Sequence, residues 1–244
     1  MKQSIFTVKT NEALTRDIYK MTLEGDTSAI TRPGQFVNVK IDGLYLRRPI
    51  SVCDMDDSLL TLIYKVVGEG TGIMSEMEKG TELDLLTGLG NGFDVTKAKD
   101  KALVAGGGVG LPPMFYLSRK LIEAGVTPVV ISGFNSKDDI FLADDFKALG
   151  VDFKVATVDG SAGVKGFVTS LIPEVGEYSY FYTCGPEPML KAISDATVTS
   201  GQLSFEERMG CGFGACMGCS CETKYGTKRI CRDGPVLEKE EVIW

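Results

Sequence analysis

The chain has 244 residues, of which 43% are hydrophobic and 24% charged, as in ordinary globular proteins, so extensive disorder and collagen-like repeats are excluded. Its 26 basic and 33 acidic side chains give a net charge of −7, which leaves no positive surface suited to a nucleic acid or an anionic membrane. The absence of histidine excludes a Ser-His-Asp triad, an HExxH zinc site and a Rieske centre.

The length predicts about two domains and a small additional module. The longest stretch without a charge, 102–118, is interrupted by glycines and prolines, so it is not expected to span a bilayer. The N-terminal segment MKQSIFTVKTNEALTR lacks the apolar core of a signal peptide. We therefore expect a cytoplasmic protein.

The first part of the sequence predicts an antiparallel β-barrel. Short alternating hydrophobic and polar runs, separated by turn residues, recur in SIFTVKT, DIYKMTLEG, GQFVNVKI, PISVCDM, LLTLIYKVV and ELDLLTGL. One helix is expected over 72–79, between the last two strands. The polar segment DVTKAKDK at 94–101 indicates a boundary, so the first domain is expected at 1–96.

The second part predicts an α/β domain with a parallel sheet at 97–203. Strands are expected in ALVAGG, TPVVISG, DFKVATV and YSYFYTC, and they alternate with helices at 112–124, 143–149, 167–172 and 186–196. Ligands of such sheets bind at the carboxyl ends of the strands. A ligand site is therefore expected in the loops that follow these strands.

Within the barrel, RRPIS at 47–51 begins a strand. Arg48 is placed to pair with a diphosphate, and Ser51 to reach a ring heteroatom, with proline stiffening the backbone between them. An exposed arginine beside an ordinary strand serine is the alternative. The next hairpin adds the IYK segment at 63–65, and the glycine and threonine at 70–71 open a helix.

Two loops of the second part predict a dinucleotide site. GGGVG at 106–110 ends a strand and opens a helix, so that backbone N–H groups and the helix dipole point toward an anion. Because Leu111 replaces the last glycine of the usual fingerprint, a plain glycine turn is the alternative. CGPEPM at 184–189 is expected to face the same crevice. The candidate contacts are Gly107, Gly108, Gly110, Cys184, Gly185 and Pro186.

The last segment, 204–244, is too short for a hydrophobic core of its own, and something other than apolar burial is expected to hold it together. Cys211, Cys216 and Cys219 form C-x4-C-x2-C, and Cys231 follows after eleven intervening residues. Neighbouring glycines allow the backbone to wrap around a centre. The spacing is typical of plant-type 2Fe-2S sites. We therefore predict a 2Fe-2S module with these four cysteines as ligands.

A zinc ribbon and a disulfide knot are the alternatives for this cysteine cluster. Zinc sites usually have two separated C-x2-C pairs without this density of glycine, and a chain with no export signal is not expected to rely on disulfides. Cys221 is a fifth thiol within reach, and spacing alone leaves open whether it replaces Cys219. Cys53 is interpreted as a small core residue.

In this order, the segments RPIS, LIYKVVGEGT, LGNGF, GGGVGLPP, CGPEPM and EERMGCGFGACMGC resemble the electron-transfer subunits of NAD-dependent class B dihydroorotate dehydrogenases, the PyrK family, over essentially the whole chain. The family belongs to the ferredoxin reductase-like superfamily. The resemblance implies an FAD-binding barrel, an NAD-binding α/β domain and a C-terminal 2Fe-2S module. It assigns FAD contacts to Arg48, Pro49, Ile50, Ser51, Ile63, Tyr64, Lys65, Gly70 and Thr71, and cluster ligands to Cys211, Cys216, Cys219 and Cys231.

In this family, a partner subunit carrying FMN oxidises dihydroorotate, and the electron-transfer subunit passes the electrons through its cluster and FAD to NAD in pyrimidine (UMP) biosynthesis. The resemblance therefore implies an oxidoreductase subunit in a heterotetramer of two plus two chains. The alternative is the electron-transfer subunit of another NAD(P)H-linked flavin and iron-sulfur enzyme, of the sulfide dehydrogenase or ferredoxin:NADP type. The extra Cys221 and the short gap before Cys231 depart from the family pattern and leave Cys219 the least secure ligand.

The segment FNSKDDIF at 134–141 predicts a preference for NAD over NADP. It offers Asp138 and Asp139 and has no arginine to bind a 2′-phosphate. The alternative is that the two aspartates only cap a helix.

The residues around the cysteines predict an interface. Met209, Phe213, Ala215 and Met217 carry no charge, which suits a permanent contact with a partner. Part of this surface is expected to pack on the barrel instead.

Overall fold

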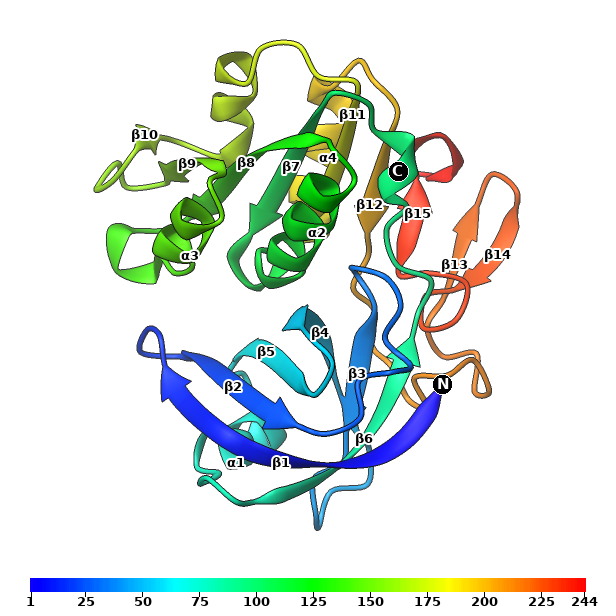
Figure 1. Ribbon diagram of the computed structural model, residues 1–244. Helices are drawn as coiled ribbons and strands as arrows, with labels where there is room; N and C mark the ends of the chain where they lie inside the picture. Colours follow the sequence, from blue (N-terminus) through cyan, green and yellow to red (C-terminus); the bar gives the residue numbers. More distant parts are fainter.

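The computed structural model describes residues 1–244, and its N-terminal part is a closed barrel with the strand order β1-β2-β5-β4-β3-β6 (Figure 1). All its strand pairs are antiparallel. The strands are β1 (Lys2–Ala13), β2 (Ile18–Glu24), β3 (Phe36–Val39), β4 (Arg48–Met55), β5 (Leu59–Lys65) and β6 (Glu82–Leu89). The alternating residues of these runs fill the barrel, so the six predicted strands and the predicted barrel are confirmed.

The helix of the barrel, α1 (Glu69–Ser75), begins and ends earlier than the predicted helix at 72–79. Its start is fixed by Thr71, whose Oγ1 accepts hydrogen bonds from the backbone N–H groups of Val67 (3.0 Å) and Gly68 (3.3 Å). The glycine-rich sequence there has a low helix propensity, so hydrophobic periodicity placed the helix too late. Met74 of α1 packs into the barrel core.

The second part is a seven-stranded sheet with the order β10-β9-β8-β7-β11-β12-β15 (Figure 1). Its strands are β7 (Lys101–Gly107), β8 (Thr127–Phe134), β9 (Asp152–Thr157), β10 (Val164–Lys165), β11 (Tyr180–Cys184), β12 (Gly201–Ser204) and β15 (Val236–Glu238). All neighbours are parallel except β15, which runs antiparallel to β12. The four predicted strands and the parallel sheet are confirmed.

Helices cover both faces of this sheet. The α-helices are α2 (Pro112–Glu123), α3 (Ala143–Ala148) and α4 (Glu187–Ala196), and the 3-10 segments are η1 (Val95–Lys97), η2 (Gly108–Gly110), η3 (Lys137–Asp139), η4 (Val168–Glu174) and η5 (Lys239–Glu241). Leu117 and Leu121 of α2 pack on one face, and Leu190 and Ile193 of α4 on the other. The expected helix at 167–172 is a 3-10 segment, because Pro173 cannot donate an α-helical hydrogen bond.

The C-terminal residues form a hairpin, β13 (Ser220–Thr223) and β14 (Gly226–Arg229), before β15 joins the edge of the sheet. Contrary to expectation, apolar burial does help to hold this segment. Ile230, Leu237 and Val242 are at most 5% exposed and pack into the same core as α4. This segment has too few apolar residues for a separate core, so its apolar side chains pack into the core of the sheet domain.

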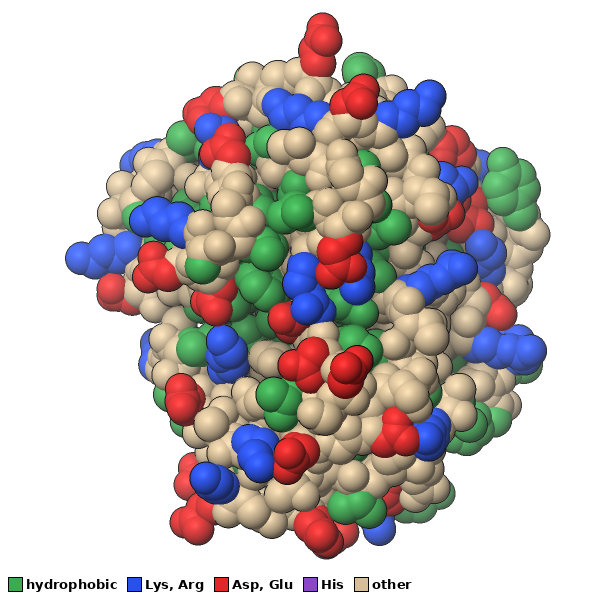
Figure 2. All heavy atoms as spheres, viewed as in Figure 1, with side chains coloured by type: hydrophobic (Ala, Val, Ile, Leu, Met, Phe, Trp, Pro, Cys, Tyr) green, Lys and Arg blue, Asp and Glu red, His purple; other side chains and the backbone are tan.

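Two ion pairs join the barrel to the sheet domain. Asp54 of β4 contacts Arg119 of α2 at 2.7 Å, and Lys20 of β2 contacts Asp145 of α3 at 3.3 Å. Between the sheet domain and the barrel, Figure 2 shows hydrophobic surface flanked by charged side chains. None of the helices is long and apolar enough to cross a membrane.

Candidate cofactor sites

Arg48 and α1 form a candidate diphosphate site in the barrel. The guanidinium of Arg48 lies across the start of α1 and donates to the carbonyl oxygen of Leu46. A Cβ at Gly70 would lie 2.2 Å from Nε of Arg48, so the arginine needs a glycine there. The first turn of α1 and a permanently charged, planar donor are thus side by side, which is an arrangement suited to phosphate oxygens.

The neighbouring Arg47 has a different role. It contacts Asp84 of β6 at 2.9 Å and donates to the carbonyl oxygens of Asp84 (2.9 Å) and Asn38 (3.3 Å). Burial raises the pKa of Asp84, but hydrogen bonds from Arg47 and Gln3 outweigh it and leave that pKa below its usual value. Arg47 therefore braces the barrel, and Arg48 alone of this pair is placed for a ligand.

The residues of β4 alternate between two environments. Pro49 pairs with Asn38 of β3, and Ser51 pairs with Phe36. Ile50 packs against the barrel core instead. Because directly paired residues of neighbouring strands share a face, Pro49 and Ser51 stand together on the outside of the barrel. A ligand ring bound on this outer face would contact the side chains of Pro49 and Ser51 and only the backbone of Ile50.

The side chains of the IYK segment on β5 also alternate between the two faces of the strand. Tyr64 is buried in the barrel, where its hydroxyl donates to Oδ1 of Asn11 at 3.0 Å and burial raises its pKa. Ile63 packs on the opposite side, against the core of the sheet domain. Lys65 is exposed and contacts Asp17 at 3.2 Å. Of the three, Ile63 has its side chain toward the sheet domain, and Tyr64 offers only its backbone.

The two loops expected to bind a dinucleotide lie side by side at the carboxyl ends of β7 and β11. A Cβ at Gly110 would lie 2.2 Å from the carbonyl oxygen of Cys184, and one at Gly107 would lie 2.3 Å from Sδ of Met189. Gly108 has a positive φ of 52° and faces open space. Burial raises the pKa of Cys184 to about 12, so its thiol stays protonated. This shared crevice includes Gly185 and Pro186 and was expected from the sequence.

The two aspartates after β8 have different surroundings. Oδ2 of Asp139 accepts from the backbone N–H and the hydroxyl of Ser136, both at 3.1 Å, so Asp139 caps η3 as the alternative interpretation proposed. Asp138 is exposed and makes no such bond. Asp138 is therefore the acidic side chain left to meet a ribose.

The cysteine loop gathers backbone N–H groups around its sulfurs. Sγ of Cys211 accepts from Ala215 (3.2 Å) and Cys216 (3.4 Å), and Sγ of Cys216 accepts from Gly218 (3.5 Å). Positive φ angles at Gly212 and Gly214 allow this wrapping, as the glycine density predicted. Burial raises the pKa of Cys211, but backbone hydrogen bonds outweigh it and bring that pKa down to about 6. The loop therefore stabilises a thiolate at neutral pH.

The four cysteines come together as two pairs. Cys211 and Cys216 are within hydrogen-bonding reach of one another, as are Cys219 and Cys231, and the N–H of Cys231 donates to Sγ of Cys219 at 3.4 Å. Burial and the side-chain contact with the thiol of Cys219 raise the pKa of Cys231 to about 12. No three acidic or cysteine side chains are gathered as ligands of a single metal ion. Two pairs of thiols match the needs of a two-iron cluster, in which each iron takes two thiolates, so the residues fit this group.

The fifth thiol, Cys221, lies on β13 of the hairpin. It is partly buried and packs against the core of the sheet domain. Burial raises its pKa, and the negative charge of Glu207 raises it further. Cys219 has the hydrogen bond from Cys231, whereas Cys221 has no hydrogen bond to any of the cluster cysteines.

The uncharged surface around the cluster is smaller than expected. Phe213 and Met217 are 44% and 59% exposed, and Ala215 and Cys216 are exposed beside them. Met209 instead packs against the core of the sheet domain. The apolar surface near the cluster therefore consists of Phe213, Ala215 and Met217.

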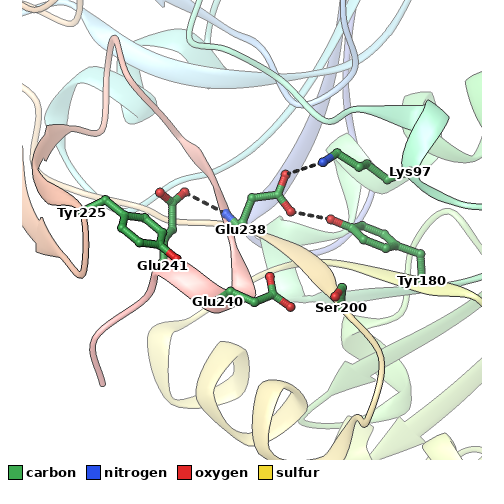
Figure 3. Close-up of a pocket in the computed structure, with 7 residues that line it drawn as sticks. All are labelled: Lys97, Tyr180, Ser200, Tyr225, Glu238, Glu240 and Glu241. Carbon is green, nitrogen blue, oxygen red and sulfur yellow. Dashed lines mark hydrogen bonds and ion pairs between the residues drawn. The ribbon is translucent and has the colours of Figure 1, made fainter.

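A cavity of about 420 Å³ lies away from these sites, between the sheet and the C-terminal segment (Figure 3). Glu238 of β15 projects into it and accepts hydrogen bonds from the hydroxyl of Tyr180 (2.6 Å) and from Nε2 of Gln202 (3.0 Å). Tyr180 begins β11, so the cavity lies at the opposite end of the sheet from the glycine loops. Its carboxylate network joins the C-terminal segment to the sheet.

Two amide side chains were not singled out in the sequence: Asn38, which is buried, and Asn91, which is partly buried. Asn38 of β3 donates from Nδ2 to the carbonyl oxygen of Cys211 at 3.2 Å. Asn91, in the LGNGF segment after β6, bonds to the backbone of Val236. Only the polar residue inside the hydrophobic run FVNV signals the first of them, and its partner is 173 positions away.

Comparison with known proteins adds independent evidence. Residues 206–243 match the family model of the iron-sulfur cluster binding domain of dihydroorotate dehydrogenase B. A NADH-dependent reduced ferredoxin-NADP oxidoreductase has a similar structure, with a TM-score of 0.89 and 28% identity, covering 98% of this chain and 90% of that one. A ferredoxin NADP+ reductase from Neisseria gonorrhoeae has the same fold, with a TM-score of 0.69 and 17% identity over 80% of this chain and 90% of that one.

Curated relatives match over the full length. The dihydroorotate dehydrogenase B (NAD(+)) electron transfer subunit of Fusobacterium nucleatum is 43% identical over 99% of both chains. The corresponding subunit of Bacillus pumilus is 42% identical over 99% of this chain and 98% of that protein. The resemblance found in the sequence is thus confirmed, and the chain belongs to the family of dihydroorotate dehydrogenase B (NAD(+)) electron transfer subunits.

Proposed function

We propose that this chain carries electrons from a dihydroorotate-oxidising partner through a 2Fe-2S cluster and FAD to NAD+, as an oxidoreductase subunit of pyrimidine biosynthesis. The full-length identity with subunits of that name supports this function. The observation that carries it is the position of the cysteine loop. It lies against β3 of the barrel, the strand paired with the RPIS strand β4.

FAD fits the outer face and open end of the barrel. Arg48 and the start of α1 at Gly70 and Thr71 would hold the diphosphate. Pro49, Ile50 and Ser51 would hold the isoalloxazine ring, together with residues 63–65 of the neighbouring strand. Ile63 would contribute its side chain there, whereas Tyr64 would contribute its backbone and Lys65 the aliphatic part of its side chain.

The 2Fe-2S cluster fits the two cysteine pairs. Cys211 and Cys216 would bind one iron, and Cys219 and Cys231 the other. The N–H groups aimed at Sγ of Cys211 would stabilise negative charge on the ligands. When bound, the cluster exchanges single electrons, the flavin one or two, and the nicotinamide a hydride, so the flavin connects the two kinds of transfer.

NAD fits the crevice between the two glycine loops. Gly107, Gly108 and Gly110 would let the pyrophosphate approach the backbone at the start of α2, and the 184–186 loop would form the opposite wall. No imidazole is needed, because hydride transfer between stacked rings requires no proton-transferring side chain. Protein groups would supply position and exclude water.

The partner is the catalytic subunit of the dihydroorotate dehydrogenase. Phe213, Ala215 and Met217 are exposed beside Cys216 and would meet it, which would bring the cluster close to the partner's FMN. The two-plus-two stoichiometry, the cytoplasmic location and the domain limits 1–96, 97–203 and 204–244 stay predictions.

One alternative has a specific observation in its favour. The similarity to the ferredoxin-NADP oxidoreductase extends over almost the whole chain with a TM-score of 0.89. Its sequence identity is 28%, against 43% for the dihydroorotate dehydrogenase subunit of Fusobacterium nucleatum, so the dihydroorotate-linked function is preferred.

The test is an anaerobic NADH titration of the purified holoprotein, followed by absorption and electron paramagnetic resonance. The expected result is one FAD and two irons per chain, bleaching of the flavin by NADH and the signal of a reduced 2Fe-2S cluster. NADH-dependent reduction of a dye is expected as well, without oxidation of dihydroorotate by the chain alone. A colourless zinc protein, or a flavin that NADH does not reduce, would contradict the proposal.

A further inference from the structure

A buried amide of the barrel holds the first cluster ligand. Asn38 is 1% exposed, and its Nδ2 donates to the carbonyl oxygen of Cys211 at 3.2 Å. A Cβ at Gly212 would lie 2.1 Å from the same nitrogen, so the close approach requires glycine at that position. The peptide that links Cys211 to Gly212 therefore packs directly on a side chain of the flavin barrel.

The same amide stands on the proposed flavin face. Asn38 pairs directly with Pro49, and Phe36 pairs with Ser51, so these side chains share the outer side of the sheet. Val37, between them, points into the barrel core. Neighbouring strands lie about 4.8 Å apart. Asn38 is thus one strand spacing from the proposed ring contact Pro49, and its side chain also contacts the backbone of the cluster ligand Cys211.

The polarity of Asn38 exceeds what packing requires. Its Oδ1 is buried and has no hydrogen-bond partner in the chain. An unpaired buried acceptor is destabilising, so an apolar side chain would serve better if Asn38 only filled space. Its backbone is held as well, because Arg47 donates to its carbonyl oxygen at 3.3 Å and is itself paired with Asp84. The amide therefore offers a donor to Cys211 and a free acceptor, on a braced strand.

We propose, given the function above, that Asn38 is a positioning residue that ties Cys211 to the flavin-binding face and so sets how cluster and flavin lie relative to each other. Partners that hold a metal ligand from outside orient that ligand and tune its metal. Hydrogen bonding and solvent exposure around a cluster set its reduction potential. Asn38 thus adjusts both the cluster potential and the rate of electron transfer at the flavin–cluster junction.

The test compares the wild-type holoprotein with Asn38→Leu and Asn38→Asp. Leucine removes the donor while nearly keeping the volume, and aspartate keeps the shape but turns an acceptor toward the carbonyl oxygen of Cys211. Both variants are expected to keep FAD and iron, to shift the midpoint potential of the cluster and to slow electron transfer between flavin and cluster by about tenfold or more, as loss of such outer partners does. The potential is measured by redox titration with electron paramagnetic resonance, and the rate by stopped-flow spectroscopy after NADH addition.

Asn91→Leu is the matched control, because Asn91 holds the same segment through Val236 without touching a cluster ligand. It is expected to lower thermal stability while leaving the cluster potential and the transfer rate at their wild-type values. Wild-type potential and rate in both Asn38 variants, or an equal shift in Asn91→Leu, would overturn the proposal. If Asn38→Leu does not retain the cluster, the cluster potential and transfer rate of Asn38→Asp decide. Loss of the cluster from both variants would overturn the proposal, because Asn38 would then have only a structural role. A wild-type protein without FAD or iron would contradict the proposed function instead.

Discussion

Asn91 and Val236, 145 positions apart, are joined by a pair of hydrogen bonds. Nδ2 of Asn91 donates to the carbonyl oxygen of Val236 at 2.7 Å, and the N–H of Val236 donates to Oδ1 of Asn91 at 3.1 Å. The backbone N–H of Asn91 also donates to the carbonyl oxygen of Gly234 at 2.7 Å. These three hydrogen bonds link the barrel to the sheet domain. They hold the chain just after Cys231, as pairing with a neighbouring strand would.

Replacement of Asn91 should loosen the attachment of β15 to the barrel. Asn91→Ala leaves the backbone N–H and carbonyl oxygen of the buried Val236 without their amide partner, at a cost of about 1–3 kcal/mol each in the free energy of unfolding. We expect a lower midpoint of thermal unfolding and faster proteolysis near residue 236. Asn135→Ala, at an exposed asparagine, is the control and should leave both unchanged. Equal stability of the two variants would show that the Asn91 bonds are not needed.

The flavin and cluster sites should be separable by mutation. Arg48→Ala removes the cation that lies across Gly70, so we expect loss of FAD with the iron content retained. Cys211→Ser removes one iron ligand and should have the reverse effect. Flavin absorbance and iron analysis of the purified variants provide the measurement. Loss of both cofactors from Arg48→Ala would argue against two independent sites.

Cys219, and not Cys221, should be the third cluster ligand. Cys219 is paired with Cys231 by a hydrogen bond to its sulfur, whereas Cys221 lies in the hairpin. We expect Cys219→Ser to abolish the visible spectrum of the cluster and Cys221→Ser to leave it intact. The opposite result, a bleached Cys221→Ser protein and a normal Cys219→Ser protein, would reverse the assignment.

The preference for NAD over NADP should depend on Asp138. Asp138 is exposed in η3, after β8, whereas Asp139 is occupied in capping η3. We expect higher kcat/KM with NADH than with NADPH in dye reduction, and a reduced preference in Asp138→Asn. Asp139→Asn is the matched control, because it removes a neighbouring negative charge that is occupied in capping η3. Equal or better use of NADPH by the wild-type protein would refute the prediction.

Local patterns in the sequence predicted most of the fold. The six barrel strands alternate with period two, and the strands and helices around GGGVG follow the rhythm of a parallel sheet, so each could be recognised without its partners. The short strand β12, GQLS, has one large apolar residue and gave no such signal. It is buried because β11 and β15 pair with it from both sides.

The candidate sites were predictable to the extent that they depend on short spacings. The cysteine pattern and both glycine loops were found, because their residues are close in the sequence. The side-chain direction of Tyr64 was not, because a strand alternates between two faces and the sequence does not say which face binds the ligand. Asn38 and Asn91 were missed as well, since each acts on a backbone group more than 140 positions away.

Reconstitution with the partner tests the central claim most directly. The holoprotein is mixed anaerobically with an FMN-containing catalytic subunit of a class B dihydroorotate dehydrogenase, and NADH formation from dihydroorotate and NAD+ is followed at 340 nm. We predict that neither protein alone reduces NAD+ with dihydroorotate, that the mixture does, and that Cys211→Ser abolishes the reaction while dye reduction by NADH persists. Failure of the two proteins to associate, or reconstitution only with a sulfide- or ferredoxin-linked partner, would contradict the account.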